Sequence, residues 1–351
     1  MQWNALKMLD SNGEFLTAAQ GAEVLATAAN EDYTAAEATE LGKVTEKDYS
    51  DYHIEKVLSL KLVDTEAIRN SHFTVALDTI NSVGGIILPK LLQRLGVDKI
   101  YNINSEPDGK FAHNPEPLPQ NLGDISALVK EKKADIGIVV DPDVDRLAFI
   151  NEDGTMFGEE YTIVSIADYV LTHTPGSTVS NLSSSRALRD ITEKHGCKYE
   201  SAAVGEVNVV SMMKATNAVI GGEGNGGVIY PECHYGRDAL VGIALMLTQM
   251  AKSGKTTTQL RATYPDYVIS KNRIDLRPDV NVDALLSKVK ECHKNDKVND
   301  IDGVKIDFAN SWVHLRKSNT EPIIRIYAEA HSEKEAQALA EEIKGEISAL
   351  I

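Results

Sequence analysis

Hydrophobic and polar positions along the chain alternate in a way that predicts parallel β-sheets. The apolar run at residues 73–77 is followed by a glycine pair that leads into a periodic helix at 86–95, and a second strand comes at 100–103. A helix at 125–131 and a strand at 135–140 complete the series. Because parallel strands must be joined by crossover segments, usually helices, this βαβαβ order favours a parallel sheet.

A similar order of helices and strands recurs further along the chain. It places a helix at 163–171, a strand at 179–182, a helix at 187–195, a strand at 218–220 and a helix at 238–251. We therefore expect a second α/β unit, followed by a linker near residues 256–264.

Both ends of the chain differ from these units. The beginning offers a short strand-like piece near Phe15 and a helix rich in alanine and glutamate at 18–29, which do not complete a βαβ unit. After residue 267 the pattern changes to strands and two helices, at 282–293 and 332–350. We expect a separate unit of different architecture there.

Three aspartates, Asp141, Asp143 and Asp145, stand directly after the apolar run at 136–140. In an extended or tightly turning segment, carboxylates at alternate positions can converge on one point, and such hard oxygen ligands suit Mg²⁺. Arg146 adds a fixed positive charge, which suits an anionic substrate such as a phosphate. A solvated acidic turn is the alternative, and it stays open.

A calcium-binding EF-hand does not fit this segment, although Glu152 falls at the twelfth position of a loop that begins at Asp141. The sixth position of such a loop needs glycine for its sharp turn, and Arg146 occupies it here. The residues before the loop are β-branched and strand-like, whereas an EF-hand needs an amphipathic helix.

A glycine-rich stretch at 221–227 follows a predicted strand and presents Glu223 and Asn225. Its glycines match the spacing of a dinucleotide-binding loop, but that loop needs a helix to open at the glycines, and an extended segment with Pro231 follows instead. A loop that offers a carboxylate and an amide to sugar hydroxyls fits better. A simple turn is the alternative.

A further polar loop concentrates hydrogen-bond donors near the C-terminus. Two guanidiniums, two hydroxyls and an amide can surround a phosphate dianion there. The candidates are Arg316, Ser318, Asn319, Thr320 and, on the strand that follows, Arg325. A polar turn with structural ion pairs is the alternative, because turns favour serine, asparagine and threonine in any case.

Composition and charge narrow the class of partner. The 351 residues contain 42% hydrophobic and 25% charged residues, as is usual for globular proteins, and their net charge of −16 disfavours binding to nucleic acid or anionic membranes. Cys197, Cys233 and Cys292 lack CxxC spacing, so they indicate neither a disulfide framework nor a cysteine zinc site. With no apolar stretch of about 18 residues and no signal peptide, we expect a cytoplasmic protein.

Taken together and in this order, the acidic, glycine-rich and C-terminal loops resemble those of the α-D-phosphohexomutase family. This family includes phosphoglucomutases, phosphomannomutases and phosphoglucosamine mutases. The resemblance implies that the acidic loop binds Mg²⁺ through Asp141, Asp143 and Asp145. It also implies that Glu223 and Asn225 hold the 3- and 4-hydroxyls of a hexose.

The same resemblance implies roles for residues that the sequence alone leaves undecided. Lys7, by composition a surface residue, falls where the family has a candidate general acid or base, and Arg146 would assist catalysis beside the metal. Arg237, which would usually form part of a helix N-terminus, would contact the substrate. The phosphate that does not react would be held by Arg316, Ser318, Asn319, Thr320 and Arg325.

The implied fold class is α/β, with successive three-layer α/β domains that have mixed, largely parallel sheets, plus a C-terminal α+β domain. A remnant of domain 1 and a linker would take residues 1–70, domain 2 with the metal loop 71–153, and domain 3 with the sugar-recognition loop 154–263. Domain 4, with the phosphate-binding loop, would take 264–351. The implied partner is a small phosphosugar, and the chain would be a monomer or a homodimer.

The implied reaction moves a phosphoryl group between the 1- and 6-positions of glucosamine, glucose or mannose phosphate through a phosphoserine. That serine lies in a Ser-His-Asn-Pro loop, which these residues lack, since His113-Asn114-Pro115 follows an alanine. We therefore expect that the N-terminal part with the serine is missing and that this form is inactive. A non-catalytic phosphosugar-binding protein is the alternative. Gly227 stands where several members have histidine, so the preferred sugar stays open.

Overall fold

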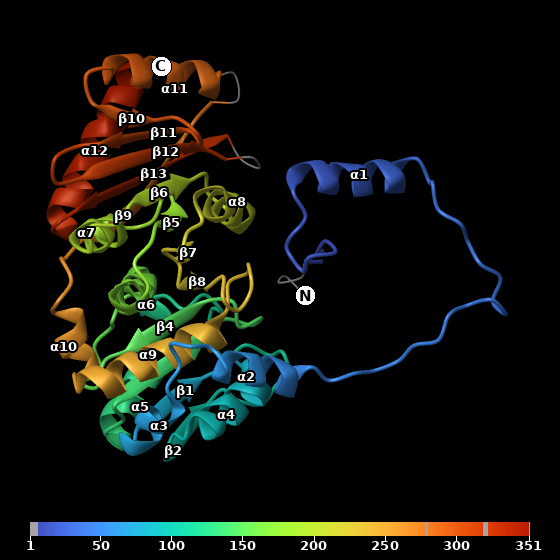
Figure 1. The fold of residues 1–351 in the computed structure, drawn as a ribbon. Helices are drawn as coiled ribbons and strands as arrows, with labels where there is room; N and C mark the ends of the chain where they lie inside the picture. Colours follow the sequence, from blue (N-terminus) through green and yellow to red (C-terminus); the bar gives the residue numbers. More distant parts are fainter. Residues whose placement is uncertain (1–5, 278–279, 319–321, 351) are drawn as a thin grey trace.

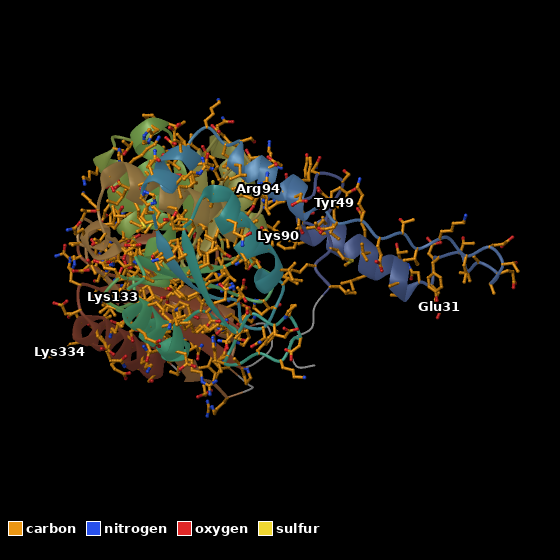
Figure 2. The ribbon with its side chains drawn as sticks, turned by 90° about the horizontal axis from the view of Figure 1, so that it is seen from below. Glu31, Tyr49, Lys90, Arg94, Lys133 and Lys334 are labelled. Atoms are coloured by element: carbon orange, nitrogen blue, oxygen red, sulfur yellow. The ribbon has the colours of Figure 1, made fainter. Side chains whose placement is uncertain are left out.

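The computed structural model describes residues 6–277, 280–318 and 322–350 (Figure 1). Three sheets with their helices follow one another along residues 50–350, and the segment before them extends away as an arm. Figure 2 shows this arm from below, with Glu31 out along it and Tyr49 near the point where it joins the rest of the molecule. The arm contains α1 (Ala18–Ala29), the helix expected from the sequence, and none of its residues is buried.

The first sheet has the strand order β2-β1-β3-β4. Its parallel strands are β1 (Thr74–Asp78), β2 (Lys99–Ile103) and β3 (Ile136–Val140), and β4 (Leu147–Ile150) runs antiparallel to β3. The accompanying helices are α2 (Ser50–Leu58), α3 (Thr65–Asn70), α4 (Gly84–Leu95), the 3₁₀ helix η1 (Pro119–Asn121) and α5 (Gly123–Lys132).

Alternate residues of this sheet point into two different cores, as the two-residue period of a strand requires. Val75 and Leu77 of β1 belong to the core that includes α3 and α4, whereas Ala76 belongs to the smaller core beneath α5. In β3, Ile138 and Val139 divide between the two cores in the same way. Helices therefore cover both faces, which explains why β3 is a continuous apolar run.

The second sheet has the order β6-β5-β7-β8. Its parallel strands are β5 (Thr178–Asn181), β6 (Tyr199–Ala202) and β7 (Ile220–Glu223), and β8 (Gly227–Ile229) returns antiparallel to β7. The helices are α6 (Glu159–His173), α7 (Ala187–Lys194), α8 (Glu206–Thr216), α9 (Ala239–Ser253) and α10 (Thr257–Arg261). The linker expected near 256–264 instead contains α10, because Thr256 and Gln259 form a capping box that starts a short helix.

Helix α9 joins the first two units. Every residue from Ala239 to Met250 is buried, and the helix contacts α2, α3 and α4 on one side and α6 and β8 on the other. A single hydrophobic core therefore runs through both units. At its start, the Asp238 side chain accepts hydrogen bonds from the backbone N–H groups of Leu240, at 2.8 Å, and Val241, at 3.3 Å. This cap satisfies donors that the first helical turn cannot pair internally.

The third sheet is antiparallel throughout, with the order β10-β11-β12-β13-β9. Its strands are β9 (Val268–Asp275), β10 (Lys297–Asn299), β11 (Val304–Asp307), β12 (Trp312–Lys317) and β13 (Ile323–Ala330), and its helices are α11 (Val282–Cys292) and α12 (Glu333–Leu350). One face packs on the two helices. Side chains of the other face reach the second unit, where Lys305 Nζ donates to the Leu182 carbonyl at 2.7 Å.

The fold class expected from the sequence is confirmed. The first two sheets are mixed and largely parallel, and the last unit is an antiparallel sheet with helices on one face. In the first two units, the helices and strands that the sequence analysis did not predict are α2, α3, η1, β4, β6, α8 and α10. Over the described ranges, no helix combines the length and apolar character needed to cross a membrane.

We predict that Leu245→Ala lowers the free energy of unfolding by about 2–5 kcal/mol, because the shortened side chain leaves a cavity beside α9 in the core that both α/β units share. Leu245 is fully buried in α9, whereas Leu25 on α1 is 72% exposed. Urea denaturation should show the loss for Leu245→Ala and a change within about 0.5 kcal/mol for the control Leu25→Ala. Equal effects from the two substitutions would contradict the shared core.

Candidate active site

The acidic loop connects β3 to β4 and brings its three carboxylates together. Oxygen atoms of Asp141, Asp143 and Asp145 lie within 4.8 Å of one another. The loop turns through Val144, whose φ of 62° is in the left-handed region that β-branched residues rarely adopt. Strained backbone of this kind persists only where surrounding contacts enforce it, and it is often found at functional sites.

Asp141 is the buried anchor of this loop. Its Oδ1 accepts hydrogen bonds from the backbone N–H groups of Asp145, at 3.1 Å, and Arg146, at 3.0 Å. Burial, reinforced by the charges of Asp145 and Asp143, raises the pKa of the Asp141 carboxyl to about 7. The three carboxylates of the loop repel one another at this short range, and a divalent cation among them would relieve that repulsion.

Lys7 reaches this loop from the arm. Its ammonium group pairs with Asp143 and lies 3.1 Å from Oδ2 of Asp145. Partial burial works against the charged ammonium, but the hydrogen bond with Asp143 and the charge of Asp145 outweigh it, so the pKa of Lys7 is raised. Lys7 therefore carries its proton, which suits a proton donor or a cation beside an anion better than a base.

Arg146 lies beside the aspartates but is held loosely. Its Nε is 3.5 Å from Oδ2 of Asp141 and 3.9 Å from Oδ1 of Asp145, and its Nη1 is 3.6 Å from Oε1 of Glu116. The side chain is 30% exposed. These long contacts leave the guanidinium able to turn towards an anion that enters the site.

Arg237 has a different environment from the one expected of a substrate contact. Its guanidinium is nearly buried and donates to Asp145 at 2.6 Å, to Glu206 at 2.8 Å and to Glu223 at 3.0 Å. Burial opposes the charge of Asp145, but Arg237 and Lys7 outweigh it and keep the pKa of that carboxyl below its usual value. Arg237 therefore ties the acidic loop to the second sheet.

The glycine-rich stretch forms the tight hairpin between β7 and β8, and no helix opens at its glycines. This observation removes the structural basis for a dinucleotide-binding loop. The Gly226 carbonyl accepts a hydrogen bond at 3.0 Å from the backbone N–H of Leu147, directly after the acidic loop. A side chain at Gly226 would collide with the Leu147 carbonyl, 2.4 Å from the position of a Cβ. The two loops are therefore in direct backbone contact.

Glu223 is buried at the end of β7, and protein donors already occupy both carboxylate oxygens. Oε1 accepts from Asn181 Nδ2 at 2.7 Å and from the Gly205 N–H at 3.3 Å, while Oε2 accepts from Arg237. Asn225 is half-buried, and its Oδ1 accepts from the Gly227 N–H at 3.2 Å. For Glu223 to bind a sugar hydroxyl, the hydroxyl would have to share or replace one of these donors.

The C-terminal loop lies between β12 and β13, and of its predicted ligands Asn319 and Thr320 fall outside the described residues. The described Ser318 closes the hairpin, with its N–H donating to the Ile323 carbonyl at 3.1 Å. Arg316 Nε lies 2.9 Å from Oδ2 of Asp302. Arg316 and Arg325 stand directly opposite each other in the sheet.

Arg273 on β9, which the sequence analysis missed, extends this pair of arginines into a row. It stands opposite Arg325, so three guanidinium-bearing residues cross three neighbouring strands. Like charges placed directly opposite one another destabilise a sheet. Arg273 Nε lies 3.6 Å from Oδ1 of Asp275, and Arg316 pairs with Asp302, so carboxylates offset part of this repulsion. An anion bound along the row would offset more of it. No local pattern marks Arg273, because its neighbours in the row are distant in sequence.

Comparisons with known proteins match all three units to the same family. Models described as phosphoglucomutase/phosphomannomutase alpha/beta/alpha domain II, alpha/beta/alpha domain III and C-terminal domain match residues 51–154, 158–267 and 277–346. A phosphoglucomutase/phosphomannomutase of Thermococcus kodakarensis is 37% identical over 344 residues, covering 97% of this chain and 74% of the relative. This chain belongs to the phosphoglucomutase/phosphomannomutase family. A probable phosphoglucosamine mutase of Methanopyrus kandleri is 29% identical, covering 97% of this chain and 75% of the relative.

Solved structures of this phosphohexomutase family have the same fold. A phosphoglucomutase/phosphomannomutase family protein of Burkholderia thailandensis superimposes with a TM-score of 0.81 at 23% identity, covering 95% of this chain and 71% of the other. The N-acetylphosphoglucosamine mutase of Aspergillus fumigatus, solved with GlcNAc-6P and magnesium, gives a TM-score of 0.56 at 17% identity. The match covers 87% of this chain and 71% of the other.

In this phosphohexomutase family member, the predicted site residues form two groups. Lys7, the three aspartates, Arg146, Arg237 and the β7–β8 hairpin make one continuous set of contacts. The C-terminal loop is connected to that set indirectly. Asp302, which pairs with Arg316, also accepts a hydrogen bond at 2.9 Å from the N–H of Val204, just before Glu206. The sequence analysis did not predict the contact between Glu206 and Arg237.

Proposed function

We propose that this chain carries the metal, sugar and phosphate sites of a phosphohexomutase that interconverts the 1- and 6-phosphates of glucosamine, glucose or mannose. The observation that carries the proposal is the set of contacts of Arg237, which joins the acidic loop to the hairpin with Glu223. A metal loop and a sugar loop in direct contact are what phosphoryl transfer to a sugar hydroxyl needs. The names of the relatives cover the same three sugars without choosing among them.

We propose Mg²⁺ as the cofactor, with Asp141, Asp143 and Asp145 as its ligands. Three carboxylates in one loop provide the oxygen ligands. The Lys7 ammonium lies beside two of them, so this place attracts cations. When bound, the ion would neutralise negative charge on the transferring phosphoryl group. The Aspergillus fumigatus protein of the same fold was solved with magnesium and a phosphosugar, which supports this choice.

The chain's own residues would orient the substrate and handle its proton. Arg146, held loosely beside the aspartates, would turn towards the reacting phosphate, and protonated Lys7 would donate a proton to an oxygen that gains charge. Arg237 would act chiefly by positioning Asp145 and Glu223. The arginines opposite one another on β12 and β13 would hold the distal phosphate, so that the sugar can bind in either orientation.

These 351 residues contain no serine in the loop context that the family uses to carry the phosphate, and we propose that on their own they bind phosphosugar without turnover. The non-catalytic phosphosugar-binding protein is thus the second candidate. We keep the proposal of a cytoplasmic location. It agrees with three unpaired cysteines among the described residues.

The function is tested by turnover. A coupled assay on glucosamine, glucose and mannose 6-phosphates, with a catalytic amount of the bisphosphate, should show no activity for the 351-residue chain. The same chain preceded by the serine-bearing N-terminal segment of the Thermococcus kodakarensis relative should be active, because the phosphate needs a covalent carrier between the two ends of one sugar.

Comparable turnover without the added segment would overturn the need for that serine. Ser183 would then be the first residue to substitute, since its hydroxyl is 2.9 Å from Nδ1 of His314. Nε2 of this histidine donates to the Asp302 carbonyl at 2.7 Å, which leaves Nδ1 as an acceptor for the serine proton. No turnover by the extended chain, despite sugar phosphate binding, would favour the binding protein.

We predict that Mg²⁺ binds to the acidic loop and that Asp143→Asn weakens this binding at least about tenfold, or about 1.4 kcal/mol. The substitution removes one of three charged ligands and keeps the size of the side chain. Calorimetric titration should show the loss for Asp143→Asn and no change for Asp153→Asn, an exposed aspartate in the next turn. Equal Mg²⁺ affinity in the wild type and Asp143→Asn would exclude this site.

We predict that Arg316→Ala weakens binding of hexose 6-phosphate roughly ten- to a hundredfold, because a charge-assisted contact with phosphate contributes about 1.5–3 kcal/mol. Arg94→Ala is the control, since Arg94 pairs with Glu55 on the far side of the first unit and is 40% exposed. Titration of both variants with glucose 6-phosphate measures the effect. Unchanged affinity in Arg316→Ala would place the phosphate elsewhere.

A further inference from the structure

A second group of metal-ligating side chains lines a cavity of about 520 Å³ that Asp143 also borders. His53 comes from α2, in the first unit, while His234 lies in the loop after β8 and Asp238 directly before α9. The group therefore bridges two units that are distant in sequence. The mechanism proposed above uses none of these three residues.

The three donor atoms of this group converge on one point. Nε2 of His53 lies 2.8 Å from Oδ2 of Asp238, and Nε2 of His234 lies 2.9 Å from the same oxygen. All three atoms are within 4.8 Å of one another. In a tetrahedral zinc site with ligands at about 2.0–2.1 Å, neighbouring ligand atoms are about 3.3 Å apart, so widening the two short contacts by about half an ångström would admit the ion.

The carboxylate of Asp238 is oriented in advance for this role. Its other oxygen, Oδ1, accepts the backbone N–H groups of Leu240 and Val241 in the first turn of α9, which fixes the direction of Oδ2. The residue is only 5% exposed. Hydrogen bonds that orient a ligand reduce the cost of organising a metal site.

The ligand chemistry separates this group from the acidic loop. Two imidazole nitrogens and one carboxylate suit Zn²⁺ and similar transition metals, whereas three carboxylates suit Mg²⁺. A site with three protein ligands leaves a coordination position for water or a ligand, and the cavity provides room for one.

We propose that His53, His234 and Asp238 form a second metal site that binds Zn²⁺ or a chemically similar divalent transition metal. An ion held there connects α2 to the start of α9. Binding therefore stabilises the joint between the two α/β units, besides occupying the wall of the cavity next to Asp143. This inference does not depend on the proposed reaction.

The test is calorimetric titration of the full 351-residue chain with Zn²⁺ at pH 7.5, with Mg²⁺ in excess to saturate the acidic loop. We expect one tight Zn²⁺ equivalent, weakened at least about tenfold in His53→Gln and in His234→Gln. Glutamine retains an N–H donor for Asp238, so the network that joins the units keeps its hydrogen bonds. His72→Gln is the matched control, because His72 pairs with a single aspartate, Asp98, and is 73% exposed.

Cobalt provides a readout that needs no variant. Co²⁺ bound to the wild type should give visible absorption bands of a four-coordinate site, and Zn²⁺ should displace it and raise the unfolding temperature. Loss of the Zn²⁺ equivalent in Asp143→Asn, but not in the histidine variants, would assign the ion to the acidic loop. No Zn²⁺ binding by the wild type, or the same Zn²⁺ affinity in the wild type and in both histidine variants, would show that these residues form only a hydrogen-bonded network.

Discussion

The contacts of one buried guanidinium organise this site. Arg237 lies among Asp145, Glu206 and Glu223, and taking such ions out of water costs several kcal/mol each unless partners replace the lost hydration. These carboxylates come from the loop after β3, the first turn of α8 and the end of β7. Because each needs the same guanidinium, the three segments must meet at one point. The constraint brings the acidic loop of one sheet against the β7–β8 hairpin of the next.

The same constraint leaves the acidic side of the site with too much negative charge. Arg237 serves three carboxylates, while Asp141 and Asp143 have the loosely held Arg146 and the ammonium of Lys7 as their nearest cations. The raised pKa of Asp141 is one expression of that repulsion, beyond the effect of burial. A polypeptide that maintains such an excess is suited to a divalent cation and then to the phosphate that the cation attracts.

Helix α9 connects the acidic loop and strand β8 to the shared core. Its first N–H, from Ala239, donates to the Val144 carbonyl in the acidic loop at 3.2 Å, and the N–H of Asp238 donates to the Val228 carbonyl in β8 at 2.9 Å. The buried length of the helix is shared by both α/β units. Displacing α9 would therefore move both loops together. The third sheet contacts the second unit through several side chains, including Lys305 with the Leu182 carbonyl, His314 with the Ser183 hydroxyl, and Asp302 with the N–H of Val204.

The sequence predicts the features that depend on neighbouring residues: most of the helices, the buried strand β3, and the acidic, glycine-rich and arginine-bearing loops. It did not predict α2 or β6, which are short and only partly buried, or β4, whose pairing depends on a neighbouring strand. The packing of distant elements places Arg237 between the two loops, Arg273 opposite Arg325, and His53 beside Asp238. Each of these contacts joins residues far apart in the chain. They form where helices and sheets pack, and no local pattern encodes that packing.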